Sequence, residues 1–522
     1  MAVGAPLTCD DRVCEDMIGA GGRDTYRVKR LRGRRGIRGR RGVRRGRVSG
    51  VRVGAPDPWL TKNAGLVTVT ELARRLEVVA ALDAAVGPIK VRDRGFSAGQ
   101  LLVGIMAAQL AGEDFLVGLD RQRADAAGQV LAPVPGLAST TAAGLARRIT
   151  VQQWAAVEQG VATATGTMMR LLPPARAAVL TEQATIDLDT TDVEVYGRKK
   201  RGVAYNYAGQ RCGRPHVACW AETTTVLAAD LLCGDVDPRG GAAGLLRRAL
   251  AGLPVPVRAG KVRLRTDAGY FAGELARAAH EEGVGFAIGA KRIAPLWRML
   301  AGLTEADWTD AIDMAGAQVA VADYRPDWWP ADTYCLIRRV RLDVAAGQVS
   351  ADPRSRRRRT LHPDQRTLPL AELAAAEAVY AYSFILTNLD VATGEQAAAA
   401  EHWYRHRTTI ENLFRDSKHG AALRHLPSGY PEVNTAWMWG ALLAATLAGW
   451  LHQLTGTVLP DHTLAGHGVR EGQAMIATLR RRLIGIPARL IRHAHTLTLR
   501  PPPGHLLLAE VLTRIRALPT PT

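Results

Sequence analysis

The middle of the chain alternates between strand-like and helix-like segments, and this alternation most constrains the fold. Residues 178–191, 217–232, 261–269 and 284–288 are rich in apolar and β-branched residues and predict strands. Residues 271–282 carry apolar residues at helical spacing and lie between the last two of these segments. A strand, a helix and a strand in succession predict an α/β fold class for this part of the chain.

Helical signals dominate the residues before this unit. Residues 67–86, 97–110 and 139–150 have the apolar spacing or the polar first residues expected of helices. In a protein that acts on DNA, helices joined by short loops suit a recognition fold, and we expect that role here, although no helix-turn-helix pattern is clear.

One strongly apolar segment bears on the compartment. Residues 436–451 form the most apolar run, which is shorter than the roughly 20 residues needed to span a bilayer. This run predicts a buried helix. The N-terminus carries no apolar signal segment, so we expect a cytoplasmic protein.

The net charge of +19 is unevenly distributed. Residues 1–52 contain 15 Arg and Lys against 5 Asp and Glu, which gives +10 and leaves +9 for the remainder. A basic chain of this size favours nucleic acid as a partner. The arm alternates Arg and Gly with little to bury, so we expect it to be disordered. It is either a sequence-independent DNA-binding arm or sequence upstream of the true start of translation.

Acidic residues on two predicted strands and one predicted helix could lie together. Asp187 and Asp189 alternate along one strand and therefore point to the same face. Asp267 ends a second strand, from which its carboxylate could reach Asp189. Glu411 would come from a helix that follows the strand predicted at residues 379–387. Clustered carboxylates repel one another unless a hard divalent cation lies among them.

Two Mg²⁺ ions held roughly 4 Å apart by such carboxylates support in-line displacement at a phosphodiester bond. Each acid also has a structural interpretation. An Asp at a strand end is usually a turn or capping residue, and a helical Glu beside Arg and Lys is usually a solvated ion pair. The combination of positions favours the metal site.

Residues 404–418 predict one amphipathic helix with two distinct faces. At about 100° per residue, an acid, two bases and a phenol fall within roughly 60° of one another. These residues are Tyr404, Arg407, Glu411 and Lys418. The apolar residues Trp403, Ile410, Leu413 and Phe414 lie on another side, and we expect them to be buried. The charged stripe suits a carboxylate that holds a metal beside cations that hold phosphates.

The spacing of this stripe resembles the Y-(2)-R-(3)-E-(6)-K signature of the bacterial insertion-sequence DDE transposases (DDE group 1 type), because all four residues match it. Asp189, followed by two Thr, resembles the first acid of that family, with Asp187 as a weaker candidate. Residues 265–271 resemble the segment that carries the second acid, Asp267. Residues 195–207 and 214–216 are similar to one branch of the group, and the resemblance covers residues 63–518.

The resemblance implies an RNase H-like catalytic core with a β-rich insertion, preceded by an α-helical N-terminal domain. It implies that Asp189, Asp267 and Glu411 are catalytic and hold Mg²⁺ or Mn²⁺, in all two ions. By the same resemblance, DNA is contacted by Tyr404, Arg407 and Lys418. The implied partners are double-stranded DNA, as element ends and target, and a second copy of the chain in a homodimer.

The implied function is a transposase that binds the terminal inverted repeats of an insertion sequence and moves it by cut-and-paste cleavage and strand transfer. The alternatives are an RNase H-like DNA nuclease or resolvase and an inactive DNA-binding relic of an element.

The expected domains follow the chain in order. They are a basic arm at 1–56, a helical DNA-binding domain at 57–177, the first part of the core at 178–292, an insertion at 293–377, the second part of the core at 378–460, and a helical C-terminal region at 461–522.

Overall fold

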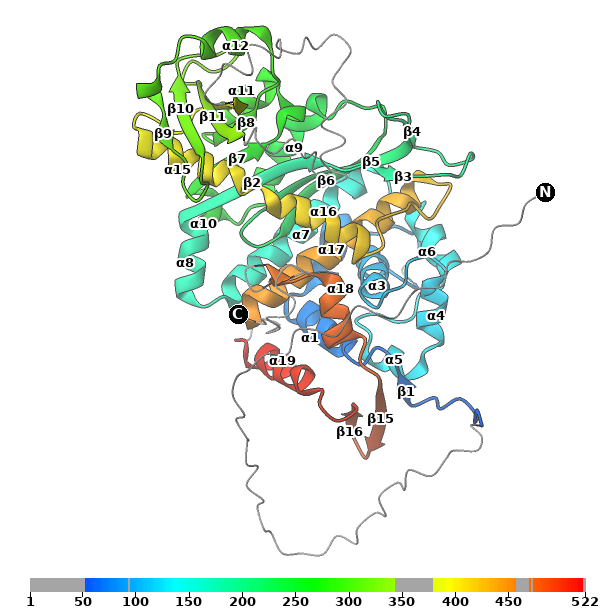
Figure 1. Ribbon diagram of the computed structural model, residues 1–522. Coiled ribbons are helices and arrows are strands. Elements are labelled where there is room, and N and C mark those ends of the chain that lie inside the picture. Colours follow the sequence, from blue (N-terminus) through cyan, green and yellow to red (C-terminus); the bar gives the residue numbers. More distant parts are fainter. Residues whose placement is uncertain (1–51, 93, 343–378, 457–468, 471–472, 520–522) are drawn as a thin grey trace, which may run out of the picture. The chain divides into compact units, whose positions relative to one another are not determined.

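The structure is a computed structural model that describes all residues except 1–51, 93, 343–378, 457–468, 471–472 and 520–522 (Figure 1). Nearly all of the expected arm, and residues 343–377 of the expected insertion, lie outside the described residues. Residues 57–522 form one unit by their contacts.

Helices fill the chain before the sheet. They are α1 (Leu66–Arg75), α2 (Val78–Val86), α3 (Ala98–Leu110), α4 (Gly118–Ala124), α5 (Ala126–Leu131), α6 (Ser139–Ala146), α7 (Val151–Leu171) and α8 (Pro174–Glu182). The single helix expected at residues 67–86 is two helices, because Glu77 between them adopts a left-handed conformation with φ of 52°. The helix expected from Ser97 is confirmed, and the Ser97 side chain caps it by accepting a hydrogen bond from the Gln100 N–H.

A large mixed sheet follows, and its middle strands confirm the expected α/β class. They are β2 (Gln183–Thr190), β5 (Arg211–Trp220), β6 (Thr225–Cys233), β7 (Lys261–Thr266) and β8 (Gly285–Gly289). Their order is β6-β5-β2-β7-β8, with β2 parallel to β7, β7 parallel to β8, and β5 antiparallel to β2 and β6. The strand expected at residues 178–191 begins later, at Gln183, because α8 occupies the residues before it.

Helices connect the parallel strands, and two short strands pair with β5. The helices are α9 (Arg239–Gly252) and α10 (Val255–Arg258) before β7, and α11 (Gly273–Glu281) before β8. The strands β3 (Val193–Glu194) and β4 (Ala204–Tyr205) both pair with the beginning of β5.

The sheet continues beyond β8 with antiparallel strands. They are β12 (Val379–Thr387), β11 (Tyr334–Leu342), β10 (Ala317–Ala322) and β9 (Thr309–Asp310), in that order outward from β8, and α12 (Ala294–Leu300) precedes them. The described part of the expected insertion is therefore β-rich.

After β12 come the helices α15 (Gly394–Arg405), α16 (Thr408–His419) and α17 (Pro431–Thr455). α17, orange in Figure 1, contains the expected apolar run, packs against α3 and β6, and buries Trp437, Trp439 and Trp450. A buried helix at this position is therefore confirmed. In the part of the chain that the structure describes, no helix is long and apolar enough to cross a membrane.

The C-terminal region is not wholly helical, contrary to the expectation. It contains β13 (Val469–Arg470), β14 (Gln473–Ala474), α18 (Ile476–Leu479), β15 (Ala488–His493), β16 (Thr496–Arg500) and α19 (Leu506–Ala517). β15 pairs with β16 and with β1 (Leu60–Thr61) from the other end of the unit. The partner strand is more than four hundred residues away in the sequence, so local pattern could not reveal this small sheet.

The single helix expected at residues 404–418 is wrong, because α15 and α16 are separated by a turn. The Trp403 carbonyl accepts hydrogen bonds from the Arg265 guanidinium (2.6 Å) and from the His406 N–H (3.3 Å). In a continuous α-helix this carbonyl would instead accept from the Arg407 N–H. A contact with a strand of the sheet therefore helps to end the helix at this point.

Candidate active site at the ends of β2 and β7

Two of the expected acids lie side by side at one edge of the sheet. Asp187 of β2 is in register with Arg265 of β7, and the two strands are parallel. Asp189 and Asp267 each follow by two residues, so both lie at the carboxyl ends of neighbouring strands and on the same face.

The Asp189 carboxylate is largely buried, and two neighbouring charges shift its pKa in opposite directions. Burial raises the pKa of Asp189 to about 6, Arg407 lowers it, and the neighbouring Asp267 carboxylate raises it. The Arg407 Nη1 lies 3.2 Å from the Asp189 Oδ2, and 14% and 16% of the two side chains are exposed. Asp267 accepts the Gly269 N–H at 2.9 Å and so caps the short turn after β7. Two like charges therefore share one cation.

The weaker candidate, Asp187, is engaged elsewhere. Arg265 donates to both of its carboxylate oxygens, at 2.7 and 2.9 Å, and the Asp187 side chain is fully buried. Burial raises the pKa of Asp187 to about 6, against the lowering effect of Arg265. This pair joins β2 to β7 two residues before Asp189 and Asp267. Such a contact indicates a structural role for Asp187.

Arg407 lies in the turn between α15 and α16, where it is the N-cap residue of α16. Burial lowers its pKa, but Asp189, Asp267, Tyr404 and Asp187 together raise it, so the net shift is upward. The residue expected to hold a phosphate thus pairs with a carboxylate in this structure.

Tyr404, at the end of α15, contacts the backbone just before Asp267. Its hydroxyl donates a hydrogen bond to the Thr266 carbonyl at 3.0 Å, and burial raises the pKa of Tyr404 to about 12. The end of β8 comes close to this contact. A Cβ added to Gly289 would lie 2.7 Å from both the Tyr404 hydroxyl oxygen and the Ala268 nitrogen. A residue without a side chain is needed there.

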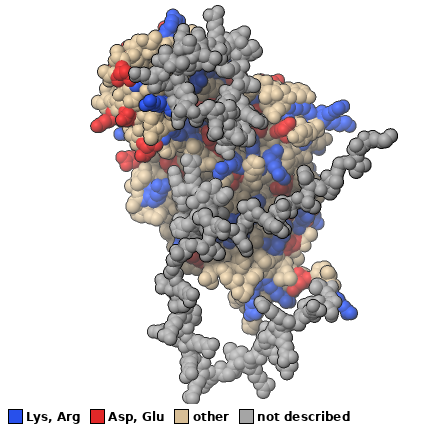
Figure 2. All heavy atoms as spheres, viewed as in Figure 1, with Lys and Arg blue, Asp and Glu red and all other residues tan. Residues whose placement is uncertain are grey.

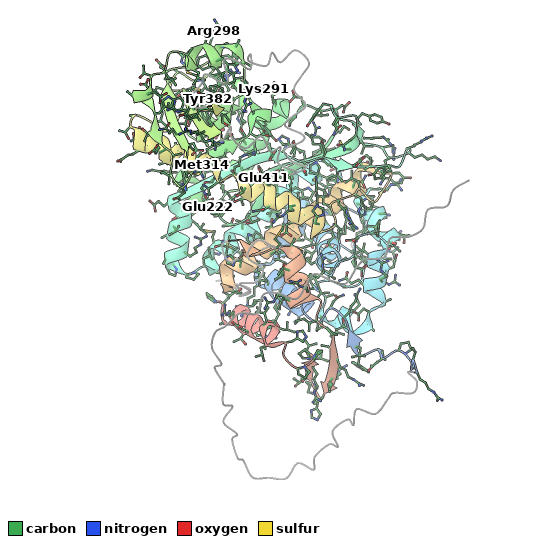
Figure 3. The ribbon with its side chains drawn as sticks, viewed as in Figure 1. Glu222, Lys291, Arg298, Met314, Tyr382 and Glu411 are labelled. Carbon is green, nitrogen blue, oxygen red and sulfur yellow. The ribbon has the colours of Figure 1, made fainter. Side chains whose placement is uncertain are left out.

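Glu411 stands apart from the other two acids. It lies in the first turn of α16, is exposed, and forms no hydrogen bond or ion pair with any residue that the structure describes (Figure 3). Within the described ranges, no group of three or more His, Cys, Asp or Glu residues is placed to hold a metal ion. The structure thus brings Asp189 and Asp267 together but does not bring Glu411 to them.

Lys418, in the last turn of α16, is bound to the protein. Its Nζ donates to the Asp192 carbonyl at 2.7 Å, and burial lowers the pKa of Lys418. The Asp192 side chain accepts from Arg214 at 2.7 Å and from Asn206 at 2.8 Å. Asp192 therefore connects α16 to the strand ends, a role that the sequence analysis missed. Its position just after the Asp189-Thr-Thr motif was the available signal.

A buried aromatic pair lies behind the two acids and was also missed. The Tyr270 hydroxyl is buried, and burial raises its pKa well above the usual value, with Asp189 and Asp267 adding to the rise. Thr190 is close enough to lower this pKa but does not form a hydrogen bond of normal geometry with the hydroxyl. The Tyr270 ring stacks on His216 with centroids 5.7 Å apart. Burial lowers the pKa of His216 to about 4, so this ring is neutral near pH 7.

The local chemistry fits a hard divalent cation in part. Asp189 and Asp267 supply oxygen ligands, and their mutual repulsion would be relieved by a cation between them. Arg407 supplies part of that positive charge in this structure. A third protein ligand is not in reach, because Glu411 is outside the group.

Comparison with known proteins gives one extensive match. The family described as transposase DDE domain group 1 matches residues 51–520. No curated protein matches the chain. Among solved structures, the piggyBac transposase synaptic complex with hairpin DNA is similar at 10% identity and a TM-score of 0.36, covering 81% of this chain and 80% of that chain.

Proposed function

This chain belongs to the group 1 family of DDE transposases, enzymes that cleave DNA and transfer its strands, and we propose that it moves an insertion sequence by cut-and-paste. In this proposal it binds the terminal inverted repeats of the element and joins them to target DNA. The observation that carries the proposal is the adjacency of Asp189 and Asp267 at the ends of two parallel strands.

We propose that β6, β5, β2, β7 and β8 are an RNase H-like core. Three antiparallel strands followed by two strands parallel to the first, with a helix before each, support this assignment. The strands β9, β10 and β11 would then belong to the insertion, and β12 would be the return to the core. The domain boundaries expected at residues 177, 292 and 460 stay predictions, as does the DNA-recognition role of the helices before residue 177.

Enzymes of this family generally use divalent metal ions. We propose Mg²⁺ or Mn²⁺, in two sites, with Asp189, Asp267 and Glu411 as ligands. When bound, the ions would activate a water or a 3′-hydroxyl and stabilise the leaving oxygen. Glu411 would become a ligand only after a movement of α16, because it lies outside the acid pair in the DNA-free structure.

Tyr404, Arg407 and Lys418 would contact phosphates at the element end. Each of the three has a protein partner in the free state, namely the Thr266 carbonyl, the Asp189 carboxylate and the Asp192 carbonyl. DNA binding would therefore exchange these contacts for phosphate oxygens. Arg407 is best suited to this exchange, since a guanidinium can grip two phosphate oxygens. Movement of Arg407 would also leave Asp189 free for a cation.

DNA is the partner that the family indicates, and we propose a homodimer that holds two element ends together. Because the substrate would be the DNA of a bacterium, the protein would act in the cytoplasm. Both points are separate from the assignment of the acids and are tested separately, by the mass of the protein on paired ends and by imaging of the tagged chain.

The test of the proposed function is a product assay on matched element ends with Mg²⁺ or Mn²⁺. The wild-type chain should produce cleaved ends and strand-transfer products, and Asp189→Asn, Asp267→Asn and Glu411→Gln should each abolish both. Glu395→Gln, which changes an exposed acid on α15, should retain them. Cleavage without transfer would favour a nuclease or resolvase, and binding without cleavage would favour a relic. Full activity of the three acid variants would refute the site.

A further inference from the structure

A basic, tyrosine-rich loop follows β3 and is joined through Asn206 to Asp192, three residues after Asp189. We define the basic loop as residues 195–210, which run from β3 through β4 to the start of β5. Its exposed tyrosines are Tyr196, Tyr205 and Tyr207, with 85%, 68% and 97% of their surface accessible. Large aromatic side chains are seldom this exposed in a cluster unless a ligand covers them.

Three of the four basic residues of the loop are exposed. Arg198, Lys199 and Arg201 are exposed, and none forms an ion pair with a residue that the structure describes. Figure 2 shows basic side chains projecting where this loop lies in Figure 1. Glu194 is the acid at the beginning of the loop, and the Tyr196 hydroxyl donates to it at 3.0 Å. One acid is therefore outnumbered by the bases.

Arginines at the end of α6 extend the basic surface. The Tyr430 ring, just before α17, has the Arg147 guanidinium 4.1 Å and the Arg201 guanidinium 4.8 Å from its centroid. Arg148 is exposed beside Arg147. The cations of the loop thus continue onto the helical region that precedes the sheet.

The path of the basic loop is held by contacts that do not use the Arg198 and Lys199 side chains. The Lys200 Nζ donates to the Leu426 carbonyl, and Arg211 donates to the Lys200 carbonyl at 2.7 Å. Asn206 donates to the Asp192 carboxylate at 2.8 Å. Because Asp192 follows the acid Asp189 so closely, the loop is tied to the strand end that carries the candidate catalytic carboxylate. A preorganised loop loses less entropy when it binds a ligand.

We propose that the basic loop binds unpaired bases of the DNA strand beside the scissile phosphate, an inference that rests on the proposed function. Bases stack on aromatic rings only when they are out of the duplex, and basic side chains follow the sugar-phosphate backbone. Duplex phosphates alone would account for the arginines but not for three exposed tyrosine rings. The loop therefore recognises DNA that is opened at the cleavage point.

The test measures DNA binding by the full-length chain, with fluorescence anisotropy in EDTA so that no strand is cut. The two probes are a blunt duplex and the same duplex with a single-stranded thymidine tail. The wild-type chain should bind the tailed probe more tightly. Tyr205→Ala/Tyr207→Ala should weaken binding to the tailed probe by about tenfold and leave the blunt probe almost unchanged. Tyr205→Phe/Tyr207→Phe should bind like wild type, because the ring is retained.

Charge variants separate the two parts of the inference. Arg198→Ala/Lys199→Ala should weaken binding to both probes and reduce the slope of log affinity against log salt by about two. The matched control Arg74→Ala/Lys261→Ala removes two exposed bases elsewhere and should have a smaller effect. Circular dichroism should show that every variant is folded.

Equal binding of the tailed probe by wild type and by the tyrosine-to-alanine variant would overturn the inference. Equal losses on both probes would also overturn it, since the rings would then not read unpaired bases. Neither result depends on catalysis, so the inference can fail while the acid assignments stand, and the reverse is also possible.

Discussion

The Arg407 guanidinium lies 3.2 Å from the Asp189 carboxylate, although the two residues come from the turn between α15 and α16 and from the end of β2. This ion pair places a cation where the proposed function requires a metal. Arg407 would therefore compete with a divalent ion for Asp189. The pair also relieves the repulsion between Asp189 and Asp267.

Arg407→Gln should bind Mn²⁺ more tightly than wild type, by about five- to tenfold, because a positive charge next to the carboxylates is removed. Electron paramagnetic resonance of free Mn²⁺ measures this directly. Arg405→Gln is the matched control, since Arg405 pairs with Glu401 rather than with the acids. Unchanged or weaker Mn²⁺ binding by Arg407→Gln would argue against competition at Asp189.

Asp187→Asn should lower stability more than Asp189→Asn. Asp187→Asn leaves the buried Arg265 without its counter-ion and should lower the free energy of unfolding by about 3 kcal/mol or more. Asp189→Asn removes the partner of Arg407, but it also removes a carboxylate that repels Asp267, so the loss should be smaller. Urea unfolding at pH 7 measures both. A larger loss for Asp189→Asn than for Asp187→Asn would exchange the roles assigned to the two acids.

Gly289→Ala should disrupt the site with a moderate loss of stability. The new methyl group would press on the Tyr404 hydroxyl and on the backbone after Asp267, at a cost of about 1–3 kcal/mol. DNA cleavage should fall much more than the melting temperature suggests. Gly244→Ala is the control, because an added Cβ there meets nothing within 4 Å. Normal cleavage by Gly289→Ala would show that the close approach is not needed.

Glu158 should make stability depend on pH. Burial raises the pKa of this α7 carboxyl to about 7, against the lowering effect of Arg248, with which it pairs at 3.1 Å. Since the folded state holds the proton more tightly than the unfolded state, whose pKa is near 4.5, the stability from this group is present below pH 4.5 and is lost as pH rises to about 7.

The size of this effect is roughly 3 kcal/mol, as an order of magnitude. It appears in the difference between wild type and Glu158→Gln, measured by urea unfolding at pH 5 and pH 8. Relative to the variant, wild type should be less stable at pH 8 than at pH 5. A difference that is the same at both pH values would mean that Glu158 is ionised throughout this range.

Local pattern was enough to predict elements whose signals lie within them. The strands β7, β8 and β12 and the buried helix α17 follow from β-branched or apolar runs, and the α3 start follows from the Ser97 cap. The proximity of Asp189 to Asp267 could also be predicted. Two neighbouring parallel strands that each end in an acid bring those acids together.

What the sequence did not reveal depends on contacts between distant segments. The break between α15 and α16 is associated with Arg265, which binds the Trp403 carbonyl from another element. The same Arg265 takes Asp187 out of the catalytic group. The role of Asp192 depends on its contacts with α16 and with the basic loop, which come from other parts of the sequence. A helical projection of residues 404–418 gives the faces of one segment and no information on its contacts with distant segments.

The most direct test of the central claim is a metal-specificity switch at the acid pair. Asp267→Cys replaces a hard oxygen ligand by a thiolate, which prefers softer ions than Mg²⁺. On matched element ends, wild type should cleave with Mg²⁺ or Mn²⁺, and Asp267→Cys should be inactive with Mg²⁺ but regain cleavage with Mn²⁺ or Cd²⁺. Wild-type rates for Asp267→Cys in Mg²⁺ would contradict the account, because Asp267 would then not hold the metal.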